Sequence, residues 1–244
     1  MGTLKQKAYS HIRGRILRGE LSPGARLSNR KLAAEVGISF IPVREAIGQL
    51  VSEGLAEHRP NYGAVVREAS REEIVDLYDF RHALECHAVK AAAKYVTAAD
   101  ISELEDRNRR LISAAVRITS PFGPGSVVCS DQFAIQDAAF HMVMLRAAGN
   151  SLVMKTIGDL QIMERVFSFR TTNLNKKRLD RVCSEHKRII MCLRNGDADG
   201  AELAMAQHLD HGKQVAVAAF DRDRASSAAQ RAFAGQLELQ IQSL

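Results

Sequence analysis

Four side chains on three predicted helices have the types and the spacing that a divalent metal ion requires. These four residues, the quartet, are Asp137, His141, His186 and His208. Asp137 and His141 are four residues apart in the predicted helix 130–148, so both lie on its apolar face. The predicted helices 178–195 and 199–222 each turn one histidine of the quartet toward their apolar face. Three neutral imidazoles and one carboxylate suit Zn²⁺, Ni²⁺ or another borderline divalent ion.

Other interpretations fit the same residues. Asp137 and His141 can form a simple hydrogen-bonded pair, and the other two histidines can be isolated core residues. Buried polar groups cluster where they satisfy one another, so one polar centre inside a helical bundle explains three inward histidines better. Such a centre with an open position also activates water in metal-dependent hydrolases, which makes an enzyme of this kind the alternative function. His211 faces partly sideways and is a weaker candidate ligand.

A charged pair lies on the apolar face of the predicted helix 71–96. Arg81 and Glu85 are one helical turn apart, within the arc of apolar residues. A buried guanidinium needs a partner, because an unpaired buried charge is strongly unfavourable. Glu85 is one possible partner of Arg81. A bound anion, most naturally a carboxylate, is the other, so this pair is a candidate ligand-binding site.

The helices that position these residues make up most of the chain after Ser70. Ser70 and Glu73 form a capping-box pattern that starts the first of them. Apolar residues then recur with helical spacing, and turn residues separate six predicted helices. Their ranges are 71–96, 98–118, 130–148, 150–170, 178–195 and 199–222. The sequence therefore predicts an all-α bundle over residues 70–222, followed at 223–244 by a tail that is either mobile or a short contact helix.

Residues 1–69 show the pattern of three short helices followed by a β-hairpin. Apolar residues recur with helical spacing, and serines stand where helix caps are needed. The expected positions are 3–19 for the first helix, Ser28 as the cap of the second, Ser39 as the cap of the third, and Pro42 to about Gly54 for its body. Two strand-like runs flank the turn sequence PNYG. The chain is therefore predicted to be mainly α, with a winged helix-turn-helix domain before the helical bundle.

The positive charge of the chain is concentrated in its first 70 residues. These residues hold 11 Lys and Arg against 6 Asp and Glu, a net charge of +5. The other 174 residues hold 23 against 22, a net charge of +1. Such asymmetry favours contact with a polyanion, and a solvated basic face is the alternative.

The predicted third helix carries the residues that we expect to meet DNA. In a helix-turn-helix unit this helix enters the major groove, and the turn before it meets phosphates. Ser39 and Arg44 suit that position, since an arginine forks to guanine or grips a phosphate. Arg30 is placed to meet the backbone, and the hairpin tip with Tyr62 and Gly63 is placed to reach the minor groove or a phosphate. An ordinary helical domain with surface arginines is the alternative.

The segment PGARLSNRKLAAEVGISFIPVREAIGQLVSEGLAEHRPNYGAVV resembles the DNA-binding domain of GntR-type transcriptional regulators. The resemblance covers residues 4–67, and PVREA in this context is highly specific. The DNA contacts that it implies fall on Arg30, Ser39, Arg44, Tyr62 and Gly63.

Phe40 departs from that family pattern, which usually has an arginine at this place. Loss of one cation should weaken DNA binding and flatten its salt dependence. Phe40 and Ile41 can instead pack on a thymine methyl group, which reads a base without charge. Packing of Phe40 beneath the helix is the remaining interpretation.

The second half of the chain resembles the FCD ligand-binding domain of FadR-type GntR regulators, over roughly residues 72–220. The matching motifs are Arg81-x-x-x-Glu85, Asp137-x-x-Phe140-His141, Ala148-Gly149-Asn150, Glu185-His186, Gly196-Asp197 and His208. The resemblance implies that the quartet binds a divalent metal and that a small organic acid lies beside it as the effector. The candidate effector-binding residues are Arg81 and Glu85. Some family members bind acyl cofactors without metal, and retention of the full quartet argues against that here.

No stretch approaches the roughly 20 apolar residues that span a bilayer, and the N-terminus has no apolar signal core. We therefore expect a cytoplasmic protein with no membrane partner. The four scattered cysteines favour reduced thiols over disulfides. Together with the resemblances, these patterns predict a homodimeric, metal-containing transcription factor. It is expected to be a repressor that binds double-stranded operator DNA and responds to a small organic acid.

Overall fold

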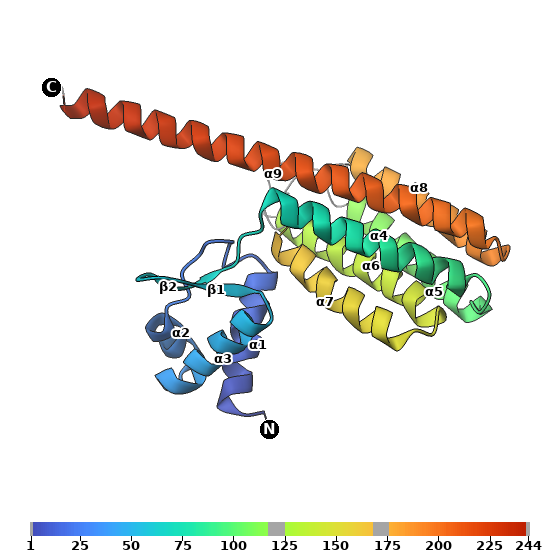
Figure 1. Ribbon diagram of the computed structural model, residues 1–244, viewed down its shortest axis with the longest axis horizontal. Coiled ribbons are helices and arrows are strands. Elements are labelled where there is room, and N and C mark those ends of the chain that lie inside the picture. Colours follow the sequence, from blue (N-terminus) through green and yellow to red (C-terminus); the bar gives the residue numbers. More distant parts are fainter. Residues whose placement is uncertain (1, 117–124, 168–175, 243–244) are drawn as a thin grey trace.

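The computed structural model divides the chain into a winged-helix part and a helical bundle (Figure 1). It describes the backbone of residues 2–116, 125–167 and 176–242, and the side chains of residues 2–113, 132–164 and 176–226. Helices dominate both parts, and a single two-stranded hairpin is the only sheet within the described residues. The predicted mainly α fold is therefore confirmed.

Three helices and a hairpin form the winged-helix part. The helices are α1 (Leu4–Leu17), α2 (Asn29–Val36) and α3 (Phe40–Ser52), and the strands are β1 (Ala56–Arg59) and β2 (Gly63–Val66). The strands pair in antiparallel fashion, with Ala56 opposite Val66. Each helix buries one apolar stripe, so Ile12 of α1, Leu32 of α2 and Ile47 of α3 meet in a common core.

The helix starts agree only partly with the capping pattern. The Ser28 hydroxyl accepts a hydrogen bond from the backbone N–H of Lys31, as an N-cap does. Ser39 also precedes a helix, but its side chain makes no capping bond. α3 begins at Phe40, two residues before the predicted start at Pro42. The earlier start is compatible with proline, because its missing N–H loses no helical bond in the first turn.

Within the described residues, six helices form the second part, as the sequence predicts. They are α4 (Arg71–Ala92), α5 (Ala98–Val116), α6 (Gly125–Ala147), α7 (Ser151–Phe167), α8 (Lys176–Arg194) and α9 (Ala198–Gln242). The predicted capping box is present at the start of α4, between Ser70 and Glu73. α9 leaves the bundle and continues as one helix through Gln242 (Figure 1). Its backbone is therefore helical across most of the predicted tail.

The largest hydrophobic core joins five helices of the bundle. Its buried side chains come from α4, α5, α6, α8 and α9, and include Val89, Leu104, Phe140, Ile189 and Met205. Burial of an apolar side chain of this size stabilises the fold by about 1.5–3 kcal/mol. α7 contributes none of the described side chains of this core. It contacts α4 and α6 of the bundle and also α1 of the winged-helix part. It is therefore a direct link between the two parts.

No helix within the described residues is long and apolar enough to cross a membrane. The thiols of Cys86 and Cys183 are buried, and that of Cys192 is partly buried. All three are free, as predicted. Cys129 lies outside the residues whose side chains are described.

Candidate functional site

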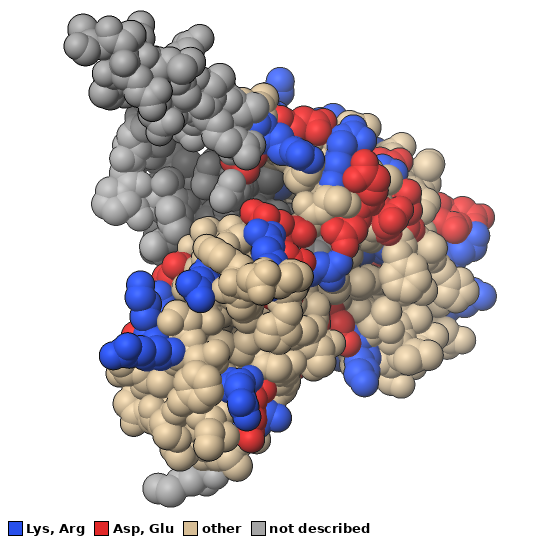
Figure 2. All heavy atoms as spheres, turned by 60° about the vertical axis from the view of Figure 1, so that its left-hand side comes forward, with Lys and Arg blue, Asp and Glu red and all other residues tan. Residues whose placement is uncertain are grey.

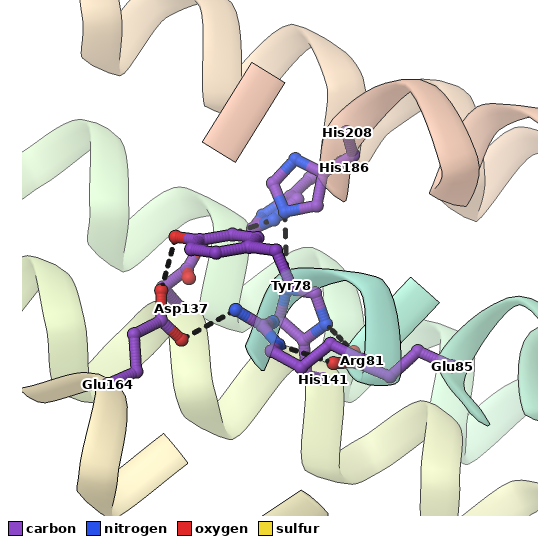
Figure 3. Close-up of polar contacts among 8 residues, drawn as sticks. All are labelled: Tyr78, Arg81, Glu85, Asp137, His141, Glu164, His186 and His208. Atoms are coloured by element: carbon purple, nitrogen blue, oxygen red, sulfur yellow. Dashed lines mark hydrogen bonds and ion pairs between the residues drawn. The ribbon is translucent and has the colours of Figure 1, made fainter. Parts of the chain in front are cut away.

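The structure brings the four residues of the quartet together inside the bundle (Figure 3). Asp137 and His141 come from α6, His186 from α8 and His208 from α9. One ligand atom of each residue lies within 4.8 Å of those of the other three. The three histidines are buried, and the side chain of Asp137 is 25% exposed. The quartet thus combines a buried nitrogen-rich environment with one carboxylate nearer to solvent.

Two glutamates outside the quartet orient two of its imidazoles. Glu85 Oε2 lies 2.5 Å from His141 Nδ1, and Glu185 Oε2 lies 2.9 Å from His208 Nδ1. A carboxylate accepts hydrogen bonds, so each contact assigns the proton of a neutral ring to Nδ1 and leaves a lone pair on Nε2. Pairs of this kind fix the tautomer of metal-binding histidines.

The two Nε2 atoms of these rings face each other at 3.2 Å. Two lone pairs at that distance repel each other unless a metal ion or a proton lies between them. Nitrogen ligands on one tetrahedral Zn²⁺ are about 3.3 Å apart, given zinc–nitrogen bonds of about 2.0–2.1 Å. The spacing of His141 and His208 therefore fits two ligands of one ion.

The other half of the quartet contains buried polar atoms without hydrogen-bond partners. Asp137 Oδ1 and both ring nitrogens of His186 are in this state among the described residues. Asp137 Oδ1 lies 3.4 Å from His186 Nε2, which is an ion-pair distance but too long for a good hydrogen bond. Buried polar atoms are normally satisfied, and a bound cation would satisfy Asp137 Oδ1 and one of the two nitrogens of His186. The residues present therefore fit a divalent metal.

Burial lowers the pKa of His186 to about 4, so its ring is neutral near pH 7. Burial opposes ionisation of Asp137, but the neighbouring His186 and His141 outweigh it and hold its pKa below the usual range. Phe140 stacks on His186 with ring centroids 3.7 Å apart and planes within 3° of each other. Neutral imidazole and ionised carboxylate are the forms that bind a metal.

Arg81 is buried next to the quartet and is held by two carboxylates. Its Nε donates to Glu85 Oε1 at 2.7 Å, and its Nη1 donates to Glu164 Oε2 at 2.5 Å. The hydroxyl of Tyr78 donates to the other oxygen of Glu164, also at 2.5 Å. Burial opposes ionisation of Glu85, but Arg81 and His141 lower its pKa to about 2. Glu85, which the sequence suggested as a partner of Arg81, is thus bonded to it. Glu164 of α7 is a second partner of Arg81.

Three residues of this centre were not identified as site residues from the sequence. Glu164, Glu185 and Phe140 complete the contacts described above, and Glu185 Oε1 also holds His211 Nδ1 at 2.6 Å. His211 therefore lies beside the quartet and not within it. Glu164 had a detectable signal, because it follows Ile157 and Gln161 at helical spacing on the buried face of α7.

The side chains expected to meet DNA are exposed on the winged-helix part. Arg30 is exposed at the start of α2, and Ser39 and Arg44 are exposed on and before α3. Phe40 is 48% exposed and Ile41 is 59% exposed. Packing of Phe40 beneath the helix is therefore wrong. The guanidinium of Arg44 lies over the Phe40 ring, 5.9 Å from its centroid.

The hairpin tip carries the second group of candidate DNA contacts. Tyr62 is 49% exposed, and the guanidinium of Arg26 lies 5.0 Å from its ring centroid. Gly63 has a φ of +96°, a conformation that favours glycine and lets the tip turn tightly. In Figure 2 the lower lobe, which is the winged-helix part, shows mainly blue and uncharged atoms, whereas the bundle above it mixes red and blue. This distribution agrees with the surplus of positive charge in residues 1–70.

Two family models match the chain. The model of the FCD domain matches residues 76–211. The model described as bacterial regulatory proteins, gntR family, matches residues 4–66. The first match lies within the helical bundle, and the second covers the winged-helix part.

Individual relatives agree with these matches. A Streptomyces ambofaciens protein, described as an uncharacterized HTH-type transcriptional regulator in an unstable DNA locus, is 29% identical over 85% of this chain and 82% of its own length. The HTH-type transcriptional repressor RspR of Escherichia coli is 27% identical over 84% of this chain and 86% of its own. The solved structure of E. coli McbR/YncC has a TM-score of 0.73 at 21% identity and covers 90% of this chain and 100% of that one. The last likeness shows a shared fold.

Proposed function

Since the chain belongs to the gntR family of bacterial regulatory proteins and carries an FCD domain, we propose that a metal-bound organic acid controls its binding to operator DNA. The chain is a DNA-binding transcriptional regulator, as its relatives are. The metal-dependent hydrolase weighed as an alternative is therefore set aside.

The contact between His141 and His208 is the observation that supports a metal most strongly. Each ring is oriented through Nδ1 by a glutamate, and the free Nε2 atoms meet at 3.2 Å. The quartet would hold one Zn²⁺ or Ni²⁺ ion, for which imidazole and carboxylate are suitable ligands. The ion would supply an electrophilic position for an oxygen atom of the acid.

Arg81 would bind the carboxylate of the acid. It is buried beside the quartet and is linked to His141 through Glu85. An arginine in a buried site binds carboxylates strongly through charge-assisted hydrogen bonds. Glu85 is better explained as a residue that positions Arg81 and His141 than as a residue that touches the acid, because both of its oxygens are already engaged.

The DNA-binding surface would use exposed residues of α3, α2 and the hairpin. Arg44, Ser39 and Arg30 would contact base edges and phosphates, and Tyr62 and Gly63 would contact the DNA at the wing. We further propose a homodimer, since two half-sites multiply affinity, and a repressor, a role that the name of RspR supports. Light scattering of the purified protein tests the dimer, and a monomer at micromolar concentration contradicts it.

A DNA-binding titration tests the proposed control. The probe is a duplex that the full-length protein selects from a random pool, and the effector panel is acetate, lactate, succinate and citrate. We expect at least one acid to change the Kd for DNA in the zinc- or nickel-loaded protein, and the change to disappear after chelation. An acid effect that is equal with and without metal contradicts the proposed role of the ion.

A further inference from the structure

The carboxylate of Glu164 lies between two donor side chains of α4. Its two oxygens are held by two different donors, Tyr78 through the hydroxyl and Arg81 through Nη1, each at 2.5 Å (Figure 3). Two converging donors of this kind form a binding site for one carboxylate. Tyr78 comes from the same helix as Arg81, whereas Glu164 reaches across from α7.

Building on the function proposed above, we propose that Tyr78 and Arg81 form the carboxylate-binding pair of the effector site. Glu164 is its internal ligand. The carboxylate of the acid displaces Glu164. The part of α7 around Glu164 is then free to shift, and the contact between α7 and the winged-helix part changes.

Glu164 is the exchangeable one of the two carboxylates on Arg81. The side chain of Glu85 is 1% exposed and is also bonded to His141, so its departure would disturb the quartet. The side chain of Glu164 is 22% exposed, and its second partner is a neutral hydroxyl. Its departure therefore leaves the quartet intact and brings its charge into water, where it is well solvated.

Charge also favours exchange over addition. The group formed by Arg81, Glu85 and Glu164 holds one positive and two negative side chains. A third carboxylate at Arg81 would lie directly beside those of Glu85 and Glu164, and like charges at such short distances repel each other. Replacement of Glu164 by the carboxylate of the acid leaves the local charge unchanged.

The residues next to Glu164 contact the DNA-binding part. Ile162 packs on the hydrophobic core of the winged-helix part. The methyl group of Met163 lies 3.9 Å from the position that a Cβ atom would take at Gly54, two residues after the last residue of α3. The C-terminal end of α7 lies beside the winged-helix part in Figure 1. A shift of α7 at Glu164 would therefore change contacts two residues beyond the last residue of α3.

α9 packs closely against Tyr78. A Cβ atom added at Gly212 would come within 2.9 Å of the Tyr78 ring, so only glycine lets the two helices approach this closely. The ring thus packs on α9, and its hydroxyl is bonded to Glu164. Its hydroxyl needs a new acceptor when Glu164 leaves, and the carboxylate of the acid supplies one.

The test compares Glu164→Gln with Asp159→Asn in the metal-loaded, full-length protein. Both changes remove one negative charge from α7, but Asp159 is exposed on that helix. An amide is a weaker competitor for Arg81 than a carboxylate, so Glu164→Gln should bind the best acid of the acetate, lactate, succinate and citrate panel about tenfold more tightly. Asp159→Asn should bind it as the wild type does. Added to Glu164→Gln, Tyr78→Phe should weaken acid binding, because the Glu164 carboxylate then no longer competes for that hydroxyl.

DNA affinity gives the second measurement. Without acid, Glu164→Gln should shift the Kd for DNA in the direction in which the acid shifts the wild type. Equal acid affinity in Glu164→Gln and wild type overturns the exchange but leaves the proposed function standing. Tighter acid binding without a shift in DNA affinity overturns the coupling through α7. If no acid of the panel binds either protein, the proposed function fails and the exchange fails with it.

Discussion

The Nε2 atoms of His141 and His208 lie 3.2 Å apart, and the Nδ1 atom of each ring is bonded to its own glutamate. The two rings come from helices α6 and α9, whose sequences are far apart along the chain. When both rings are neutral, their common orientation places two lone pairs at one point, which is unfavourable unless a metal ion or a proton lies between them. This contact is the strongest physical reason to regard the quartet as a metal centre.

The glutamate behind His208 should influence metal affinity without being a ligand. Glu185→Gln should weaken Zn²⁺ binding about 10- to 100-fold, because an amide orients and polarises the imidazole less than a carboxylate does. Competition with a chromophoric chelator measures the Kd. Glu202→Gln is the matched control, since its carboxylate pairs with Lys90 on the same helix bundle and touches no histidine in the described contacts. Equal losses in the two variants would show that Glu185 acts only through net charge.

Arg44 should contribute specificity to DNA binding. Arg44→Ala should cost about 1–3 kcal/mol on the selected duplex, because one bidentate contact to a base is worth this much. Binding to unrelated DNA should change little. Lys5→Ala removes an exposed cation of α1 and serves as the control. Unchanged discrimination between selected and unrelated duplexes in Arg44→Ala would refute the role of Arg44, and circular dichroism verifies that both variants fold.

Phe40 should read thymine methyl groups. Replacement of contacted thymines by deoxyuridine in the selected duplex should cost the wild type about 0.8 kcal/mol for each methyl group that is buried. Phe40→Ala should lose this sensitivity. Phe40→Arg should bind more tightly and should raise the slope of log K against log salt by about 1, because one further phosphate contact releases one counterion. A wild-type protein that binds both duplexes equally contradicts the methyl contact.

Arg81 should matter more for stability than another arginine with the same number of partners. Arg146 also pairs with two carboxylates, Asp100 at 2.8 Å and Glu103 at 2.9 Å, but its side chain is 54% exposed. Arg81→Met should lower the free energy of unfolding by about 3 kcal/mol, because it leaves Glu85 buried without its cation. Arg146→Met should lower it by less than about 1 kcal/mol. Urea unfolding of the metal-loaded proteins compares the two, and equal losses would contradict the central position of Arg81.

The sequence predicted the helices and the quartet because both depend on local spacing. An apolar stripe with a period near 3.6 residues identifies the buried face, and His186 and His208 lie on such faces. That the three histidines meet could be inferred, since buried polar groups seek one another.

Glu164 and Glu185 were not identified as site residues from the sequence, and the reason is physical. Which of them reaches a histidine or Arg81 depends on how far α7 and α8 rotate and slide against their neighbours, and local spacing does not determine that. Glu164 lies 83 residues from Arg81, so its contact depends entirely on packing. The exposure of Phe40 was likewise open, because the start of α3 two residues before Pro42 decides which way its first turn faces.

Metal content tests the central claim most directly. The full-length protein is dialysed against Zn²⁺ or Ni²⁺, freed of loose ions by gel filtration and measured by mass spectrometry of its metals. We expect about one ion per chain in the wild type, since four ligands form one site. His211→Ala should keep that ion, because His211 contacts Glu185 and lies outside the quartet, whereas His186→Ala should lose most of it. A wild type without metal after loading, or full occupancy in His186→Ala, would contradict the account.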